Sequence, residues 1–177
     1  MKEQHLLLES FKRNGRVNQA LLDALTPADF ALSDGRSGWT VWTVEKHLRH
    51  MAGFRVGWLW NISREHAGPL LDHARKDADG DPLWRWQESQ PADLKDAFTA
   101  GDEAALKAVQ AHVQSGEPFA DPWHEGAYQS SPAHFLQHTI VHDSHHRGQV
   151  MALRRLGGCS QEQMQQIDEH WSTWREQ

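Results

Sequence analysis

The sequence predicts an all-α protein, an antiparallel four-helix bundle with a short additional C-terminal helix. Apolar residues recur at steps of three and four over five segments, and no stretch of five or more residues alternates between apolar and polar side chains. Glycine, proline and aspartate concentrate between those segments, where they favour turns. Because 177 residues suit one domain, we expect a single helical-bundle domain over 1–177.

The first two helices are predicted from their apolar stripes and their end signals. The first helix covers 3–25 and ends before Thr26 and Pro27. The second helix begins after Thr43, a favourable N-cap residue, and runs to about His66. Its apolar stripe consists of Val44, Leu48, Met51, Trp58 and Ile62.

The rest of the chain divides in the same way. The predicted segments are an irregular excursion over 68–91, a third helix over 92–114, a fourth over 131–156 and a final amphipathic helix over 161–174. Trp84 and Trp86 are expected to anchor the excursion. Ser131 and Pro132 open the fourth helix as a cap followed by proline, and two glycines end it after Leu156.

Composition excludes several classes of protein. The 18 basic and 24 acidic side chains give a net charge of −6, which argues against binding to the phosphate backbone of a nucleic acid. No apolar run approaches the roughly 20 residues of a membrane-spanning helix. The first residues lack the apolar segment of a signal peptide, and Cys159 has no second cysteine to pair with. We therefore expect a cytoplasmic protein that binds neither nucleic acid nor membrane.

Histidine is the unusual component of this chain. Among 13 histidines, three pairs lie four residues apart, whereas a random arrangement gives about one. All three pairs belong to one ladder in the fourth helix, formed by His134, His138, His142 and His146. Imidazoles four residues apart on a helix can converge on one metal ion, and His47 or His50 of the second helix can supply a third ligand. Spacing alone leaves open which histidines bind, or whether the ladder is a set of surface or hydrogen-bonded pairs.

Two segments resemble a known family. Residues 142–149 (His-Asp-Ser-His-His-Arg-Gly-Gln) resemble the histidine-rich signature of the DinB-like superfamily of metal-binding four-helix bundles. Residues 42–52 are similar to the start of that family's second helix, where a ligand histidine follows a tryptophan by eight positions. The resemblance covers nearly the whole chain. It implies that the metal ligands are His50, His142 and His146.

The same spacing can be matched in a second register. Trp39 and His47 are also eight positions apart, so the alignment can shift by three residues. We prefer His50, because Met51, Ala52 and Trp58 follow it as the corresponding positions follow the family's ligand. His47 is then expected to be a packing residue or a partner of a ligand. His134 and His138 have no counterpart in the signature and are expected to face solvent or a pocket.

The resemblance also implies a function. Three histidines leave coordination positions open for water or substrate, and zinc or nickel is the expected metal, although iron and copper suit the same ligands. Superfamily members include transferases that use bacillithiol, mycothiol or glutathione. We therefore expect a thiol S-transferase whose partners are a small-molecule thiol and an electrophile. Family habit and exposed aromatic side chains suggest a homodimer.

Two other functions fit the same residues. His142 and His146 have the spacing of the zinc-protease motif H-E-x-x-H, with Asp143 in place of the glutamate base. This makes a metal-dependent hydrolase the less favoured enzyme class. The protein could also be a metal-binding stress-response protein without catalysis.

Several residues near the predicted site have two readings each. Arg147 and Gln149 are expected to orient either substrate or the groups that support the metal ligands, and Arg147 could equally be a surface charge. The aromatic residues near helix starts and loops are expected either to wall a pocket over the metal or to cover the end of the bundle. They are Trp39, Trp42, Trp84, Trp86, Trp123 and Tyr128.

Overall fold

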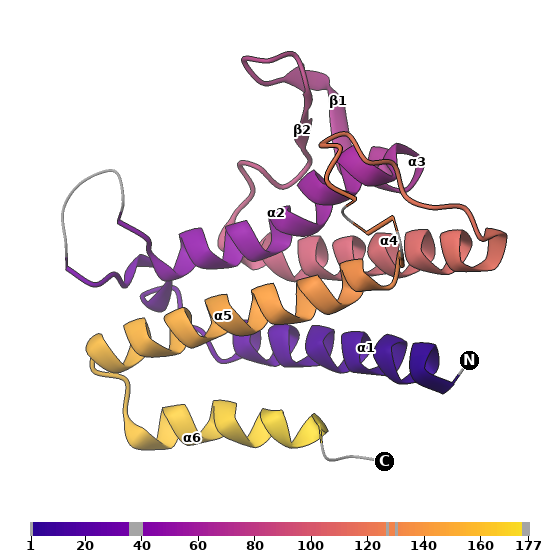
Figure 1. Ribbon diagram of the computed structural model, residues 1–177. Coiled ribbons are helices and arrows are strands. Elements are labelled where there is room, and N and C mark those ends of the chain that lie inside the picture. The colour runs from indigo at the N-terminus through magenta and orange to yellow at the C-terminus, as the bar shows by residue number, and fades with distance from the viewer. Residues whose placement is uncertain (1, 36–40, 127, 130, 175–177) are drawn as a thin grey trace.

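Four long helices form the body of the protein, in agreement with the all-α prediction (Figure 1). The computed structural model describes residues 2–35, 41–126, 128–129 and 131–174. The four helices are α1 (Lys2–Asp23), α2 (Val44–Ile62), α4 (Leu94–Ser115) and α5 (His134–Leu156). A shorter helix, α6 (Gln161–His170), follows α5, as predicted, and contacts α1. No helix in the described part of the chain is both long and apolar enough to cross a membrane.

The helices are arranged so that α1 and α2 each pack against both α4 and α5. Adjacent helices are antiparallel in the pairs α1–α4 and α2–α5, and parallel in the pairs α1–α5 and α2–α4 (Figure 1). The parallel pairs arise because residues 63–93 carry the chain back along α2 before α4 begins. The pair that forms the site is α2 and α5, which lie side by side along their length.

Helix ends follow the local sequence in most places. The hydroxyl of Thr43 caps α2 by accepting a hydrogen bond from the backbone N–H of Lys46 at 3.1 Å. Gly116 ends α4 in a left-handed conformation with φ of 75°, which glycine adopts without strain. The helix predicted to open at Ser131 instead begins at His134 without a side-chain cap, because the preceding residues form a turn.

The second predicted helix is interrupted before its expected end. Helix α2 stops at Ile62, and residues Arg64–Ala67 form a separate short helix, α3. Ser63 lies between them with φ of −153° and ψ of 75°, which is not a helical conformation. The predicted continuous helix to His66 is therefore wrong in its last turn.

The excursion contains a small β-hairpin that the sequence analysis did not predict. Strands β1 (Leu71–Lys76) and β2 (Pro82–Trp84) pair antiparallel, with Leu71 opposite Trp84. Only Leu71 of the six residues of β1 is buried and three are exposed, so the strand lacks the alternation that would have revealed it. Trp84 is 9% exposed and packs over α2 at Gly53, where an added Cβ would lie 4.0 Å from the indole ring. The expected anchoring role of Trp84 is thus confirmed.

The core is apolar at its two ends and polar in the middle. Apolar side chains from all four long helices are at most 1% exposed, among them Phe11, Leu48, Leu59, Phe98 and Phe135. Between them lie buried charged and amide side chains, including Arg55 and Asp143, which are completely inaccessible to solvent. Charges in such a position must be paired to be tolerated. Their partners are described below, because they lie directly behind the histidine cluster.

Candidate metal centre

Three histidines from two helices meet at the surface between α2 and α5. His50 of α2 and His142 and His146 of α5 each offer one ring nitrogen, and these atoms lie within 4.8 Å of one another. The Nε2 atoms of His50 and His142 are 3.0 Å apart. Two nitrogens bound to one tetrahedral ion at 2.0–2.1 Å would be about 3.3 Å apart. The donor set therefore fits a divalent metal ion, although ligation itself stays a prediction.

The protonation of the cluster suits a metal ion. Burial, together with the neighbouring histidines His142 and His50, lowers the pKa of His146 to about 3. Burial and the neighbouring His142 also lower the pKa of His50 below the ordinary histidine value. Both rings are consequently neutral at pH 7 and keep a lone pair for a metal.

Aromatic side chains hold the rings of the cluster in place. Phe54 stacks on His142, with ring centroids 4.0 Å apart and an interplanar angle of 17°. Trp42, which precedes α2, lies parallel to the His146 ring at 5.7 Å and meets the edge of His50 at 5.1 Å. These contacts restrict ring rotation, so the nitrogens are oriented before any ion binds.

His47 lies beside the cluster rather than within it. Its Nδ1 atom is 3.0 Å from Nδ1 of His146, and the residue is 7% exposed. Burial and the nearby positive groups lower the pKa of His47 to about 4. Of the two candidates in the second helix, His50 thus joins the three-histidine group and His47 contacts one of its members. Trp39, on which the alternative register depends, lies outside the described residues.

The other histidines of the ladder point elsewhere. His134 and His138 are exposed, as expected, and His138 Nδ1 is 2.5 Å from the hydroxyl of Tyr128. His145 is also exposed, and its ring lies 5.0 Å from that of His146. The His138 ring packs against Phe54 and Trp58 of α2, but of the four histidines in the ladder only His142 and His146 belong to the three-histidine group.

A buried network of charged and amide groups lies behind His142. Arg55 donates to Asp143 through Nη1 to Oδ1 at 3.0 Å and through Nη2 to Oδ2 at 2.5 Å. Asn14 and Asn18 of α1 also donate to Asp143 Oδ2, at 2.5 and 2.7 Å. Arg147 Nη1 donates to the side-chain oxygens of both asparagines, at 2.7 and 2.6 Å. The network thereby ties α1, α2 and α5 together.

This network decides between the expectations for two residues of the fourth helix. Arg147 is 6% exposed and donates to the two asparagines that hold Asp143, so it is not a surface charge and instead orients groups behind the histidine cluster, one of the roles expected for it. Asp143 is fully buried, and the opposite charge of Arg55 keeps the pKa of Asp143 below its usual range although burial alone would raise it. A general base must reach the water that it activates. The position of Asp143 argues against its use as the base of a zinc-protease mechanism.

The buried network was not predicted from the sequence, although polar residues at core positions of α1 and α2 indicate it. The apolar stripe of α2 skips from Met51 to Trp58, and Arg55 occupies the vacant core position between them. Asn14 and Asn18 likewise occupy positions on the inner face of α1, four residues apart. Polar residues at core positions indicate a buried hydrogen-bonded network.

His146 of the cluster, together with the neighbouring His47, lines a hollow in the protein surface. This hollow has a volume of about 310 Å³. It is lined by Asp34, Trp42, His47, His145, His146, Gln149 and Leu153. Gln149 is exposed and lines this hollow. Trp42 forms part of the wall of this hollow, which agrees with one of the two interpretations of the aromatic residues.

The comparison with known families agrees with the fold and the cluster. The model of the DinB family matches residues 1–177, the whole of the chain. The protein belongs to the DinB family. Neither the curated proteins nor the solved structures contained a match. Family membership and the three-histidine cluster together support a metal-binding DinB protein.

Proposed function

We propose that this DinB protein is a metal-dependent transferase that uses a low-molecular-weight thiol. His50, His142 and His146 would hold a divalent ion, with zinc or nickel as the best candidates. The observation that carries the proposal is the convergence of three histidine ring nitrogens within 4.8 Å, beside a hollow that His146 lines. Three protein ligands with space for a fourth are typical of catalytic rather than structural sites.

The chemistry follows from an open metal position. When bound, a divalent ion favours the ionised form of a thiol at neutral pH, so a strong base from the protein is unnecessary. The chain's own part is to orient the ligand rings through Trp42 and Phe54 and to receive the cosubstrates in the hollow. The sulfur then forms a bond to an electrophilic carbon while the bond to the leaving group breaks, and the thiol proton passes to solvent.

Bacillithiol, mycothiol and glutathione are the proposed thiols. The reducing cytoplasm maintains such thiols, which matches the proposed cytoplasmic location. A hydrolase is less well supported, because Asp143 is buried and ion-paired. A metal-binding protein without catalysis shares the same site and differs only in its lack of turnover, so experiment must separate the two.

Metal stoichiometry tests the first half of the proposal. The wild type, loaded with zinc or nickel and freed of excess ion, is expected to hold about one ion per chain. His50→Ala and His142→Ala should each lose it, whereas His138→Ala, which alters an exposed histidine of the same helix, should keep it. A wild type without bound ion, or a His50→Ala variant that keeps one, would overturn the proposed centre.

Turnover tests the second half. The loaded protein should conjugate at least one of the three thiols to a model electrophile such as a chlorodinitrobenzene or a bimane, and His142→Ala should not. Stoichiometric metal without conjugation by any thiol in the panel would favour the non-catalytic alternative.

A further inference from the structure

The orientation of His142 leaves one of its nitrogens buried without a partner. Its Nε2 faces His50 Nε2 at 3.0 Å, so its Nδ1 points away from the cluster. That Nδ1 is inaccessible to solvent and has no hydrogen-bond partner among the described residues. A neutral imidazole that keeps a lone pair on Nε2 carries its proton on Nδ1. When Nε2 of His142 binds an ion, the ring therefore directs a buried Nδ1–H donor towards the interior of the bundle, where an unsatisfied donor is costly.

A matching acceptor lies next to this donor. Asp143 Oδ1 is 3.9 Å from His142 Nδ1, and it is the carboxylate oxygen with fewer bonds. Among the described residues, Oδ2 accepts from Arg55, Asn14 and Asn18. Within the described part of the chain, Oδ1 accepts a hydrogen bond from Arg55 only, at 3.0 Å. A carboxylate oxygen can accept two hydrogen bonds, so Oδ1 has capacity for one more donor.

We propose that Asp143 is a positioning residue for the metal ligand His142, and this inference rests on the proposed metal centre. When Nε2 of His142 binds the ion, Asp143 Oδ1 accepts a hydrogen bond from Nδ1–H of the same ring. This hydrogen bond sets the tautomer and the direction of the His142 ring. Carboxylate partners of this kind raise the basicity of a ligand imidazole and strengthen metal binding. Asp143 itself contacts neither the ion nor a substrate.

The surroundings of Asp143 make it suitable for this role. Its carboxylate is held by Arg55 of α2 and by two asparagines of α1, so it cannot rotate freely. Arg55 is in turn held through its Nε by the carboxylate of Asp102 on α4. Residues of all four long helices therefore hold the acceptor for His142 in place, and a fixed acceptor restricts the orientation of the ligand ring.

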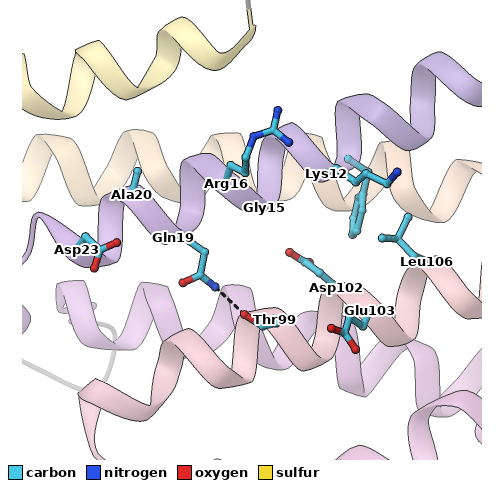
Figure 2. Close-up of a pocket in the computed structure, with 11 residues that line it drawn as sticks. Lys12, Gly15, Arg16, Gln19, Ala20, Asp23, Thr99, Asp102, Glu103 and Leu106 are labelled. Atoms are coloured by element: carbon cyan, nitrogen blue, oxygen red, sulfur yellow. Dashed lines mark hydrogen bonds between the residues drawn. The ribbon is translucent and has the colours of Figure 1, made fainter. Parts of the chain in front are cut away.

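Asp102 supplies a matched control, because it binds the same guanidinium from a different side. It lies in the groove between α1 and α4, opposite Gly15 (Figure 2). Asp102→Asn and Asp143→Asn each remove one of the carboxylate charges paired with Arg55. The side chain of Asp102 is 16% exposed and that of Asp143 is 0% exposed. Of these two carboxylates, Asp143 is the one beside the His142 ring, with Oδ1 3.9 Å from Nδ1.

The test is the zinc affinity of the full chain, measured by competition with a chromophoric chelator at pH 7. Asp143→Asn is expected to bind zinc about 10- to 100-fold more weakly than the wild type. Asp102→Asn should bind zinc within about twofold of the wild type, even where both variants lose thermal stability. Equal affinity of Asp143→Asn and the wild type would overturn the inference, as would equal losses in the two variants.

A measurement on the wild type keeps the inference testable if Asp143→Asn does not fold. In the zinc-loaded, ¹⁵N-labelled protein, the His142 ring should show a metal-bound Nε2 and a protonated Nδ1 whose proton exchanges slowly with water. Ligation through Nδ1, or an Nδ1 proton exchanging at the rate of an exposed imidazole, would overturn the positioning role. A wild type that binds no zinc would overturn the metal centre as well, whereas the outcomes above would leave the centre intact.

Discussion

His50 and His142 are 92 positions apart in the chain, yet their Nε2 atoms lie 3.0 Å from each other. The contact exists because α2 and α5 pack side by side, and because Phe54 of α2 stacks on the His142 ring at 4.0 Å. The same helix pair therefore forms part of the core and both sides of the candidate metal centre.

The protein is expected to fold without a metal. Its apolar core draws on four long helices, and the three histidines lie at the edge of that core. Removal of the ion by a chelator should leave the helical circular dichroism unchanged and lower the melting temperature. Zinc at about 100 times its dissociation constant should restore about 2.7 kcal/mol of stability. Cooperative unfolding on chelation at 25 °C would contradict this prediction.

The metal-free protein should lose stability as the pH falls below 7. The folded-state pKa is about 3 for His146 and about 4 for His47, against 6.5 for an ordinary histidine. Between these values the unfolded chain binds more protons, so the free energy of unfolding decreases as pH falls from about 6.5. At pH 5 each residue should account for a loss of about 2 kcal/mol.

Urea unfolding of the metal-free protein at pH 7 and pH 5 measures this loss. His47→Gln removes one of the two groups, so its stability should depend less steeply on pH than that of the wild type. If the free energy of unfolding changed equally with pH in the variant and the wild type, burial of His47 would not contribute to the loss of stability.

Removal of the central arginine should destabilise the fold strongly. Arg55→Met leaves the carboxylates of Asp102 and Asp143 without their buried partner, and the expected loss is about 3–5 kcal/mol. Arg75 is a matched control, because its ion pairs are exposed and Arg75→Met should cost less than about 1 kcal/mol. Chemical unfolding compares the two variants. A loss below about 1 kcal/mol for Arg55→Met would refute the stabilising role of the network.

Two helical glycines should respond in opposite ways to replacement by alanine. A Cβ at Gly15 would lie 2.7 Å from Oδ2 of Asp102, whose carboxylate is held by Arg55 (Figure 2). Gly15→Ala should therefore cost about 1–3 kcal/mol through overpacking. A Cβ at Gly57 meets nothing within 4 Å, so Gly57→Ala should add about 0.5–1 kcal/mol through helix propensity. Thermal melts of both variants measure the difference, and stabilisation by Gly15→Ala would contradict the tight α1–α4 contact.

The helices could be predicted from the sequence because their signals are local. Three- and four-residue spacing of apolar side chains, the Thr43 cap and the glycines after Leu156 act within one or two turns. The hairpin could not be predicted in the same way. Residues 71–76 have few buried side chains, and their pairing depends on Trp84 packing over α2. Such a strand forms through contacts that no alternation of its own residues reveals.

The site was predictable only in part for the same reason. The spacing of His142 and His146 places two rings on one face of a helix, whatever lies opposite. The choice between His47 and His50 depended on the rotation of α2 against α5. The Nε2 atoms of His50 and His142 are 3.0 Å apart, so His50 is the ring of α2 that joins the three-histidine group, and metal binding by that group stays a prediction. Family resemblance favoured His50 beforehand, and the geometry now supports that preference.

The sequence by itself determined the helical class, the histidine-rich face of α5 and the family. Only the tertiary structure decided which ring of α2 joins that face, that Asp143 and Arg147 point inward, and that Arg55 pairs with two carboxylates. The physical reason is that helix formation depends on neighbours within a turn or two. The burial of a charge depends instead on which distant groups come within hydrogen-bond distance, and packing alone establishes that.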